Sequence, residues 1–461
     1  MRETQIGLLL DERAARKRGS KAIEQRQRDR LGDMIAYARI RSPYYRRLYQ
    51  GLPHEITDPV RLPVTNKTDL MARFDDWTTD PAVTLEETQA FVSDPELIGT
   101  KFLNRYTVAT TSGTTGTRGL FLLDRRTLKV TKAMTARMLR SWLAPADVLA
   151  IVRGRGRMAM VIATGGHFAS AAAAAALRRG PGRSIVDVFP VQTPMPELVA
   201  RLNDFSPAIL APYASTGRLL ASEQEAGRLH IRPALVVLSA EGLPVGEYER
   251  MATAFAAKVR QGYAATECPF LSYSCQEEWL HVNSDWAILE PVDANHRPVP
   301  PGQQSHTVLL SNLANRVQPV LRYDLGDSVT MQPTPCPCGD PMPAIRVQGR
   351  TAELLTFPGS GPGQITITPL SVGTLLDEVT GLARGQVVQT GPESLSLRLQ
   401  ASPGAAPDTV WEAAQSKITH MLVDQGLSRV TVTRDPQAPA LSPGGKLRTV
   451  VPLNPTPSSP A

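Results

Sequence analysis

The sequence predicts an α/β protein, with a large N-terminal domain built from a parallel sheet and a β-rich subdomain, and a small α+β C-terminal domain. Three observations lead to this fold class. Short apolar runs alternate with helical patterns of roughly ten residues between positions 158 and 262, which is typical of βαβ units. Residues 281–330 are rich in β-forming and turn residues. After the Gly/Pro-rich segment 358–364, a separate α+β pattern begins.

Two helices are predicted within the first 143 residues. Residues 13–50 form one predicted helix, because apolar side chains at positions 31, 34, 35 and 38 share a face. A second helix is predicted at 125–143, where apolar residues recur every fourth position. The segment 51–100 contains repeated prolines, so we expect it to be irregular.

The central alternation defines the predicted parallel sheet. Its strands are expected at 158–164, 185–189, 208–211, 235–239 and 259–262. The helices between them are expected at 169–179, 197–205, 216–225 and 245–255. Ligands bind beyond the carboxyl ends of parallel strands, so the residues that follow each strand are candidate site residues.

The chain is long enough for two or three domains. We predict a large domain at 1–351, a small domain at 352–453 and a flexible tail at 454–461. The small domain has predicted helices at 370–380 and 409–425, and predicted strands at 386–389, 395–399 and 429–433.

Composition restricts the partners. The net charge of +7, from 50 basic and 43 acidic residues, suits an anionic ligand such as a nucleotide. The basic residues are dispersed, and the run from Arg13 to Lys21 is interpreted as a solvated helix face, so we expect no nucleic-acid partner. No stretch approaches the ~18 apolar residues of a membrane span. We therefore expect no membrane partner and a cytoplasmic location; the oligomeric state is left open, with a homodimer as one option.

One loop stands out for its chemistry. Residues 110–119 read Thr-Thr-Ser-Gly-Thr-Thr-Gly-Thr-Arg-Gly. Hydroxyls and main-chain N–H groups in a glycine-containing turn form a cradle for anions. The loop is not a Walker loop, because no Gly-Lys-Ser/Thr follows. Taken alone, a loop of this composition is more often an ordinary Gly/Thr turn than a phosphate site.

Four further motifs follow the loop along the chain. They are Tyr263–Glu267, Arg322–Asp327, Val347–Arg350 and Ser442–Arg448. Each motif alone occurs by chance in many proteins, but all of them in this order form a specific joint pattern.

The order of the five motifs resembles the adenylate-forming superfamily of acyl-CoA synthetases and adenylation domains, and in particular its phenylacetate-CoA ligase-like branch. Residues 42–46 and 62–70 are similar to the entry segment of that branch, and the resemblance extends from about residue 30 to 450. It implies ATP-dependent activation of an aromatic carboxylic acid to acyl-AMP with release of pyrophosphate. It also implies transfer of the acyl group to coenzyme A by a mobile small domain.

The resemblance leaves alternatives open. The acceptor could instead be a carrier-protein thiol or an amine or other nitrogen nucleophile in natural-product biosynthesis. From another class, the chain could be a non-catalytic nucleotide-binding regulator. Retention of Glu267, Asp327, Arg350 and Lys446 argues against the regulator.

The resemblance also assigns roles to residues. Lys446 is the implied catalytic lysine between the acid and the α-phosphate, Thr266 the α-phosphate contact and Glu267 the Mg²⁺ ligand. The implied ATP-binding residues are Thr111, Ser112, Gly113, Thr114, Thr115, Gly116, Thr117, Glu241, Gly242, Tyr263, Ala264, Asp327 and Arg350. The implied acid-binding residues are His167, Phe168, Tyr213, Ala214, Ala240 and Gly262.

Two positions depart from the family pattern. The loop ends in Arg118-Gly119 where the superfamily usually has Pro-Lys, which makes Arg118 a doubtful phosphate contact. At the domain junction, Ala352 stands where the family pattern places a hinge aspartate. This second departure puts the transfer half-reaction in more doubt than adenylation.

Three cysteines and one histidine form a separate group of candidate metal ligands. Cys275, His281, Cys336 and Cys338 offer three thiolates and one imidazole, a set typical of structural zinc sites. Free buried thiols and a redox role are the alternatives. Cys268 directly follows Glu267 and is expected to be a pocket wall.

Overall fold

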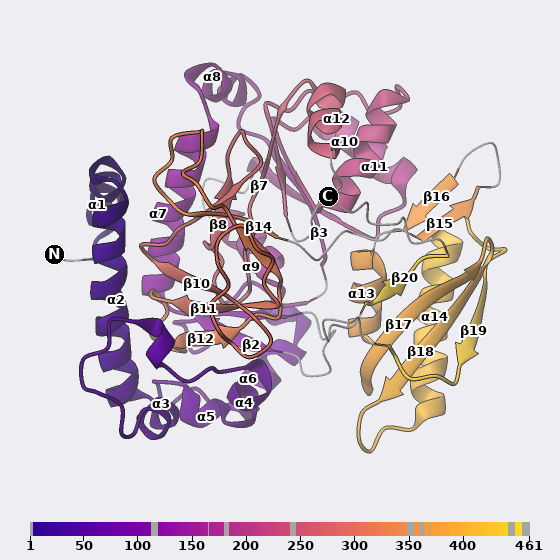
Figure 1. Cartoon of the computed structure of the whole chain (residues 1–461). Helices are drawn as coiled ribbons and strands as arrows, with labels where there is room; N and C mark the ends of the chain where they lie inside the picture. Colours follow the sequence, from indigo (N-terminus) through magenta and orange to yellow (C-terminus); the bar gives the residue numbers. More distant parts are fainter. Residues whose placement is uncertain are drawn as a thin grey trace.

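The computed structural model describes residues 3–111, 119–164, 166–178, 184–239, 246–347, 355–359, 364–367, 369–440 and 448–453. Figure 1 shows a large body on one side and a smaller α+β part on the other. The predicted α/β class is confirmed, because a parallel sheet and several β-rich regions coexist with covering helices. None of the described helices is long and apolar enough to cross a bilayer.

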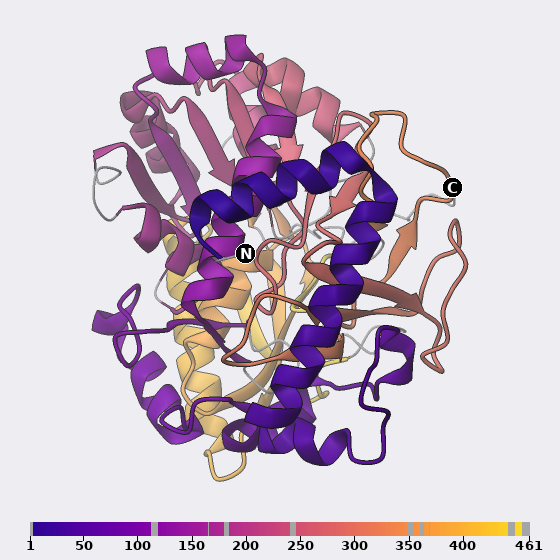
Figure 2. The same ribbon diagram turned by 90° about the vertical axis from the view of Figure 1, so that its left-hand side faces the viewer.

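The N-terminus forms a pair of helices where one helix was predicted from residue 13. Helix α1 (Gln5–Arg18) ends at Gly19, whose φ of 80° allows the chain to turn into α2 (Ser20–Arg41). Figure 2 shows the pair lying across one face of the large body. The short helices α3 (Pro43–Leu48), α4 (Lys67–Ala72), α5 (Phe74–Trp77) and α6 (Leu85–Ser93) follow.

The parallel sheet has the strand order β4-β3-β5-β6-β7. Its strands are β3 (Met158–Ile162), β4 (Val186–Pro190), β5 (Ile209–Pro212), β6 (Leu235–Leu238) and β7 (Lys258–Gln261), and all neighbours are parallel. Helices α10 (Met195–Phe205), α11 (Ala214–Glu225) and α12 (Glu247–Phe255) share one apolar core with the sheet. Helix α9 (Ala169–Leu177) contributes to a second core that contains the alternate strand residues.

The predicted strands and helices of this region differ from the observed ones by about one or two residues, within the usual uncertainty of element ends. Helix α7 (Arg125–Trp142) was also predicted. Helix α8 (Pro145–Arg153) was not predicted, and none of its residues is buried.

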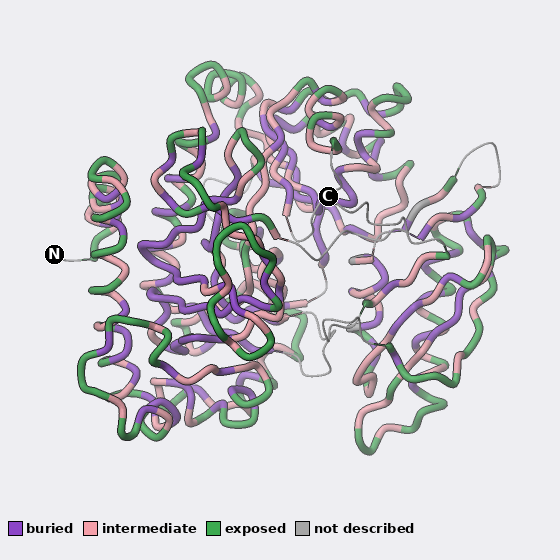
Figure 3. The backbone as a smooth tube through the Cα atoms, viewed as in Figure 1, coloured by how far each residue is buried: buried purple, intermediate pink, exposed green. Residues whose placement is uncertain are grey.

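The β-rich region surrounds the hairpin of β1 (Thr107–Thr110) and β2 (Leu120–Leu123). One antiparallel sheet joins β10 (Ala287–Val292), β11 (Thr307–Asn312) and β12 (Val320–Asp324). Another has the order β13-β14-β9-β8, with β8 (Ser272–Ser274), β9 (Leu280–Val282), β13 (Val329–Met331) and β14 (Ala344–Val347). Their apolar residues share a core with the N-terminal helices, which Figure 3 shows as buried segments inside the large body.

A buried ionic cluster fastens α1 to this body. The guanidinium of Arg137 on α7 is fully buried and contacts Glu12 at 3.2 Å, Asp285 at 2.8 Å and Asn283 at 2.9 Å. Burial by itself raises the pKa of Asp285, but the charge and hydrogen bonds of Arg137 outweigh it and leave that pKa below its ordinary value. The carboxylate is therefore ionised and paired in the folded protein.

The C-terminal part contains β15 (Leu355–Pro358), β16 (Gln364–Ile367), α13 (Pro369–Asp377), β17 (Leu382–Gly391), β18 (Ser394–Ala401), α14 (Pro407–Asp424), β19 (Thr431–Asp435) and β20 (Val450–Val451). These elements share an apolar core of their own. Ser371 and Gln425 donate hydrogen bonds to the carbonyls of Val191 and Gln192 in the large body, at 3.3 and 3.0 Å. The predicted boundary at 351/352 lies outside the described residues and stays a prediction.

Candidate active site

The chain segments that follow the parallel strands meet the β1 strand at one edge of the sheet. The N–H of Thr110 donates to the carbonyl of His167 at 2.7 Å, which joins β1 to the segment after β3. Tyr213, after β5, forms a parallel bridge with Ser239, after β6. The N–H of Gly262, after β7, donates to Leu238 at 3.2 Å. The sheet edge predicted to bind ligands therefore gathers residues from five separate segments.

The ends of the hydroxyl-rich loop are fastened to each other. Thr111 donates its N–H to the carbonyl of Gly119 at 3.0 Å, and the N–H of Gly119 donates to Thr111 Oγ1 at 2.9 Å. A Cβ at position 119 would lie 2.7 Å from the ring of Phe121. A side chain at position 119 would therefore collide with Phe121. This is a physical reason for the glycine at this position, which departs from the family pattern.

Glu267 sits in a tight turn after β7. The turn is closed by reciprocal main-chain hydrogen bonds between Ala265 and Cys268, at 3.3 and 2.9 Å. Burial raises the pKa of Glu267, and the negative charge of Asp327 adds to this effect. Tyr323 and the ammonium of Lys67 act in the opposite direction. Buried carboxylates that lie near each other favour a bound cation.

Asp327 is connected to the same turn. The Tyr263 hydroxyl donates to Asp327 Oδ2 at 2.8 Å, so the segment after β7 contacts the segment after β12. Asp327 is buried, Thr266 is partly buried and Ala264 is exposed. The structure thus brings Tyr263, Glu267 and Asp327 together, and their roles stay predictions.

The residues predicted to bind the acid differ in their surroundings. His167 is buried, its ring centroid lies 5.2 Å from that of Phe91, and its Nε2 lies 3.5 Å from the carbonyl of Asp94. The Tyr213 hydroxyl accepts from the N–H of Ala163 and lies 3.0 Å from Ser170 Oγ.

Three more of the predicted acid-binding residues are described. Ala214 is fully buried in the core beneath α11, and Phe168 packs against the core that contains α9. Of the residues that the structure describes, only Ser272 would lie near a Cβ at Gly262, with its carbonyl oxygen at 3.5 Å.

Several predicted site residues lie outside the described part of the chain. They are Ser112, Gly113, Thr114, Thr115, Gly116, Thr117, Arg118, Ala240, Glu241, Gly242, Arg350, Ala352 and Lys446. Their roles stay predictions.

The four predicted metal ligands form a cluster. Their ligand atoms all lie within 4.8 Å of one another. The Sγ atoms of Cys275 and Cys336 are 3.8 Å apart, and Cys338 Sγ is 3.2 Å from His281 Nε2. Pairing of β8 with β9, and of β9 with β14, brings Cys275 and His281 beside the loop that carries the other two cysteines. His281 Nδ1 lies 2.9 Å from the Met342 carbonyl, which orients Nε2 toward the thiols.

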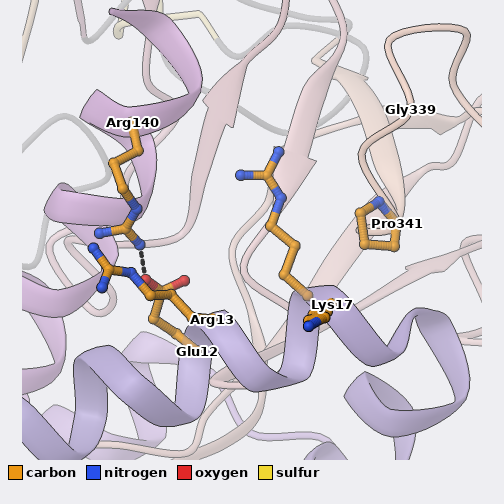
Figure 4. Close-up of a pocket in the computed structure, with 7 residues that line it drawn as sticks. Glu12, Arg13, Lys17, Arg140, Gly339 and Pro341 are labelled. Carbon is orange, nitrogen blue, oxygen red and sulfur yellow. Dashed lines mark ion pairs between the residues drawn. The ribbon is translucent and has the colours of Figure 1, made fainter.

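The structure also contains a basic hollow next to this cluster, shown in Figure 4. It is lined by Glu12, Arg13, Arg16, Lys17, Arg140, Gly339 and Pro341. Arg16 contacts Asp340 at 2.9 Å, and Glu12 is paired with Arg137 and Arg140. Ion pairs within the chain therefore occupy several of its charged groups, and none of its lining residues is a predicted ATP- or acid-binding residue.

The sequence analysis assigned no role to several polar residues near the predicted site. Lys67 and Tyr323 stand inside segments quoted as motifs, yet their proximity to Glu267 depends on the pairing of Thr65 with β12. The buried carboxamides Asn312, Asn315 and Gln318 were missed altogether. Their signal in the sequence is the recurrence of amide side chains within an otherwise apolar stretch.

The chain is similar to known proteins in both sequence and fold. The chain is 26% identical to the phenylacetate-coenzyme A ligase of Thermus thermophilus, in an alignment of 463 residues that covers 93% of this chain and 96% of that protein. No family model matches the sequence.

The fold is similar to that of 2-hydroxyisobutyryl-CoA ligase. The structure of that enzyme with 2-HIB-AMP and CoA in the thioesterification state matches with a TM-score of 0.57 and 23% identity, over 94% of this chain and 89% of that chain. Its open conformation matches with a TM-score of 0.52 and 22% identity, over 94% and 91% of the two chains. The chain is thus similar in sequence to a phenylacetate-coenzyme A ligase over most of its length and similar in fold to an acyl-CoA ligase, which supports the resemblance found in its motifs.

Proposed function

We propose that the protein is an ATP-dependent ligase that converts a carboxylic acid to acyl-AMP, releases pyrophosphate and transfers the acyl group to coenzyme A. The observation that carries this proposal is that three features lie near one edge of the parallel sheet. They are the hydrogen-bonded ends of the hydroxyl-rich loop at Thr111 and Gly119, the turn that contains Glu267, and Asp327. The names of the relatives support the reaction class, since one is a phenylacetate-CoA ligase and the other was crystallised with 2-HIB-AMP and CoA.

The proposed acid is aromatic, either an aryl or an arylacetic acid. Gly262 lacks a side chain, and Ala240 has only a methyl group, so the ends of β6 and β7 can leave a flat slot for a ring. The substrate named for the Thermus relative is phenylacetate, which supports this class.

The proposed chemistry needs positioned donors and cations rather than covalent catalysis. Hydroxyls and N–H groups of residues 112–117 would hold the β- and γ-phosphates, and Thr266 would contact the α-phosphate. Glu267 would hold Mg²⁺, which neutralises charge on the phosphates when bound. The nearness of the buried Glu267 carboxylate to Asp327 supports a cation there, since a cation would stabilise both groups in their ionised form.

The remaining nucleotide contacts are proposed from the motif positions. Asp327 would accept hydrogen bonds from the ribose hydroxyls, with Arg350 nearby. Lys446 would bridge the acid carboxylate and the α-phosphate, a task that suits a point charge on a long flexible side chain. A reaction that uses ATP and CoA, in a chain with four unpaired thiols, suits a cytoplasmic enzyme.

We also propose that Cys275, His281, Cys336 and Cys338 hold a structural Zn²⁺. A tetrahedral site with Zn–S bonds of about 2.3 Å has S···S separations near ~3.8 Å, and the Cys275 and Cys336 sulfurs are 3.8 Å apart. The hydrogen-bond partner of His281 Nδ1 leaves Nε2 as the ligand atom.

ATP–pyrophosphate exchange tests the proposed function. Exchange should depend on an acid from a panel of benzoates, phenylacetates and aminobenzoates, and CoA should then be consumed in step with AMP release. Absence of exchange with every acid would reject the enzyme proposal. Exchange without CoA consumption would favour a carrier protein or a nitrogen nucleophile as the acceptor.

A further inference from the structure

The last residue of β11 and the connection from β11 to β12 carry three buried carboxamides that the proposed chemistry does not use. Asn312, Asn315 and Gln318 are each no more than 1% exposed. Polar side chains are seldom this buried unless their groups are hydrogen-bonded. Their partners therefore indicate what this segment holds in place.

Gln318 and Asn315 bind the outer edge of β2. The N–H of Leu122 donates to Gln318 Oε1 at 2.6 Å, and Asn315 Nδ2 donates to the Leu122 carbonyl at 2.8 Å. Gln318 Nε2 also donates to the Leu120 carbonyl at 3.4 Å. Within the described sheets β2 pairs only with β1, so these side chains take the place of a third strand. Their contacts oppose a shift of β2 along its axis and so fix the register of the hairpin.

Asn312, the last residue of β11, binds the Glu267 turn. Its Nδ2 donates to the main-chain carbonyl of Glu267 at 2.7 Å. Its Oδ1 accepts from the N–H groups of Ala314 and Asn315, at 2.9 and 3.3 Å. These partners fix the orientation of the amide, because its oxygen faces two donors and its nitrogen faces an acceptor.

We propose that Asn312, Asn315 and Gln318 form a carboxamide bridge that positions the β1–β2 hairpin and the Glu267 turn relative to each other. This inference rests on the proposed function, in which the hairpin and the turn are the two halves of the nucleotide site. The three side chains are positioning residues, since each acts through main-chain groups of the site segments. Displacement of reacting groups by about 1 Å can lower a rate on the order of 10²-fold, which is the effect that the bridge prevents.

Two substitutions test the two ends of the bridge separately. Asn312→Asp keeps the oxygen that accepts from residues 314 and 315 but removes the donor to Glu267. Gln318→Met keeps the length of the side chain but removes its bonds to β2. The matched control is Asn283→Asp, because Asn283 is also buried and donates from Nδ2 to the carbonyl of Phe270 at 2.6 Å.

The readouts separate positioning from stability. We expect Asn312→Asp and Gln318→Met to lower kcat/KM for MgATP in pyrophosphate exchange by about 10–100-fold, the scale found for outer-shell partners of metal ligands. The KM for the acid should stay unchanged. Binding of Mn²⁺·ATP without acid, followed by electron paramagnetic resonance, should weaken in both variants. Asn283→Asp should change the urea unfolding midpoint without changing either nucleotide readout.

Two results would overturn the bridge. One is wild-type nucleotide binding and exchange in both bridge variants, and the other is an equal loss in Asn283→Asp. If the wild-type protein gives no exchange with any acid, the proposed function fails instead, and hydrogen–deuterium exchange tests the bridge alone. Gln318→Met must then speed exchange in β2, and Asn312→Asp must speed exchange in residues 264–268; failure of either change rejects the bridge.

Discussion

At the scale of single residues, Lys446 carries the strongest functional prediction. We expect Lys446→Ala to lower adenylation by roughly 10²–10³-fold, the usual scale for loss of one transition-state donor. Pyrophosphate exchange measures this step. Lys417→Ala is the matched control, because Lys417 is the other lysine after Lys258 and pairs with Glu378 on the surface. A near-wild-type rate for Lys446→Ala would show that the assigned role is wrong.

Gly262 tests the proposed slot for an aromatic ring. An added Cβ would meet the Ser272 carbonyl oxygen at 3.5 Å, an ordinary contact, so Gly262→Ala should fold. We expect a KM for the aromatic acid raised by about tenfold, which corresponds to about 1.4 kcal/mol, with the KM for ATP unchanged. Steady-state kinetics measure both values. Equal effects on acid and ATP would place Gly262 outside the acid slot.

The role of a single residue could be predicted where the residue belongs to a recognisable sequence motif. It could not be predicted where its position depends on contacts between distant parts of the chain. Glu267 and Asp327 were predicted because they stand in recognisable segments. The bridge residues were not, because Gln318 and its partner Leu122 are 196 positions apart. A single buried amide has no local pattern that distinguishes it from a turn residue.

At the scale of elements, the buried cluster around Arg137 holds the N-terminal helix pair. We expect Arg137→Met to lower the free energy of unfolding by about 3–5 kcal/mol, because it removes the fully buried cation between the carboxylates of Glu12 and Asp285, which keep only Arg140 and Arg30 as partners. Urea denaturation measures this loss. Arg18→Met, an exposed change on α1, should have little effect, and an equally small loss for Arg137→Met would contradict the assigned role of the cluster.

The Cys/His cluster makes a separate prediction. Protein purified without chelator should contain about one zinc per chain, as measured by elemental analysis, because the four ligands are already gathered. Cys338→Ser should lower the zinc content and the thermal unfolding midpoint. Cys268→Ser should retain the metal, because Cys268 lies outside the cluster. A metal-free wild-type protein with normal stability would favour the free-thiol alternative.

Most elements could be predicted because local patterns determine them. Strands β3, β5 and β6 are continuous apolar runs, and helices α10 and α12 show a clear apolar face. Helix α8 was missed although its apolar residues at 148, 149, 151 and 152 have helical spacing; none of its residues is buried in the fold. The break at Gly19 was missed because a glycine inside a helical pattern does not by itself distinguish a tolerated residue from a turn.

At the scale of the whole molecule, the large body and the C-terminal part have separate apolar cores. Hydrogen bonds join Val191 and Gln192, just after β4, to Ser371 and Gln425 in the C-terminal part. The sequence predicted the two-part organisation from a change in pattern, but it could not predict these contacts, because each pairs residues 180 or more positions apart.

The central claim is that the acid carboxylate attacks the α-phosphate of ATP and that CoA then displaces AMP. The most direct measurement uses an acid that supports exchange, labelled with ¹⁸O in both carboxylate oxygens, with ATP and CoA as co-substrates. Mass spectrometry of the products should find one ¹⁸O in AMP for each acyl-CoA formed, because the bridging oxygen leaves with AMP. Label in phosphate or pyrophosphate, or unlabelled AMP, would contradict the account.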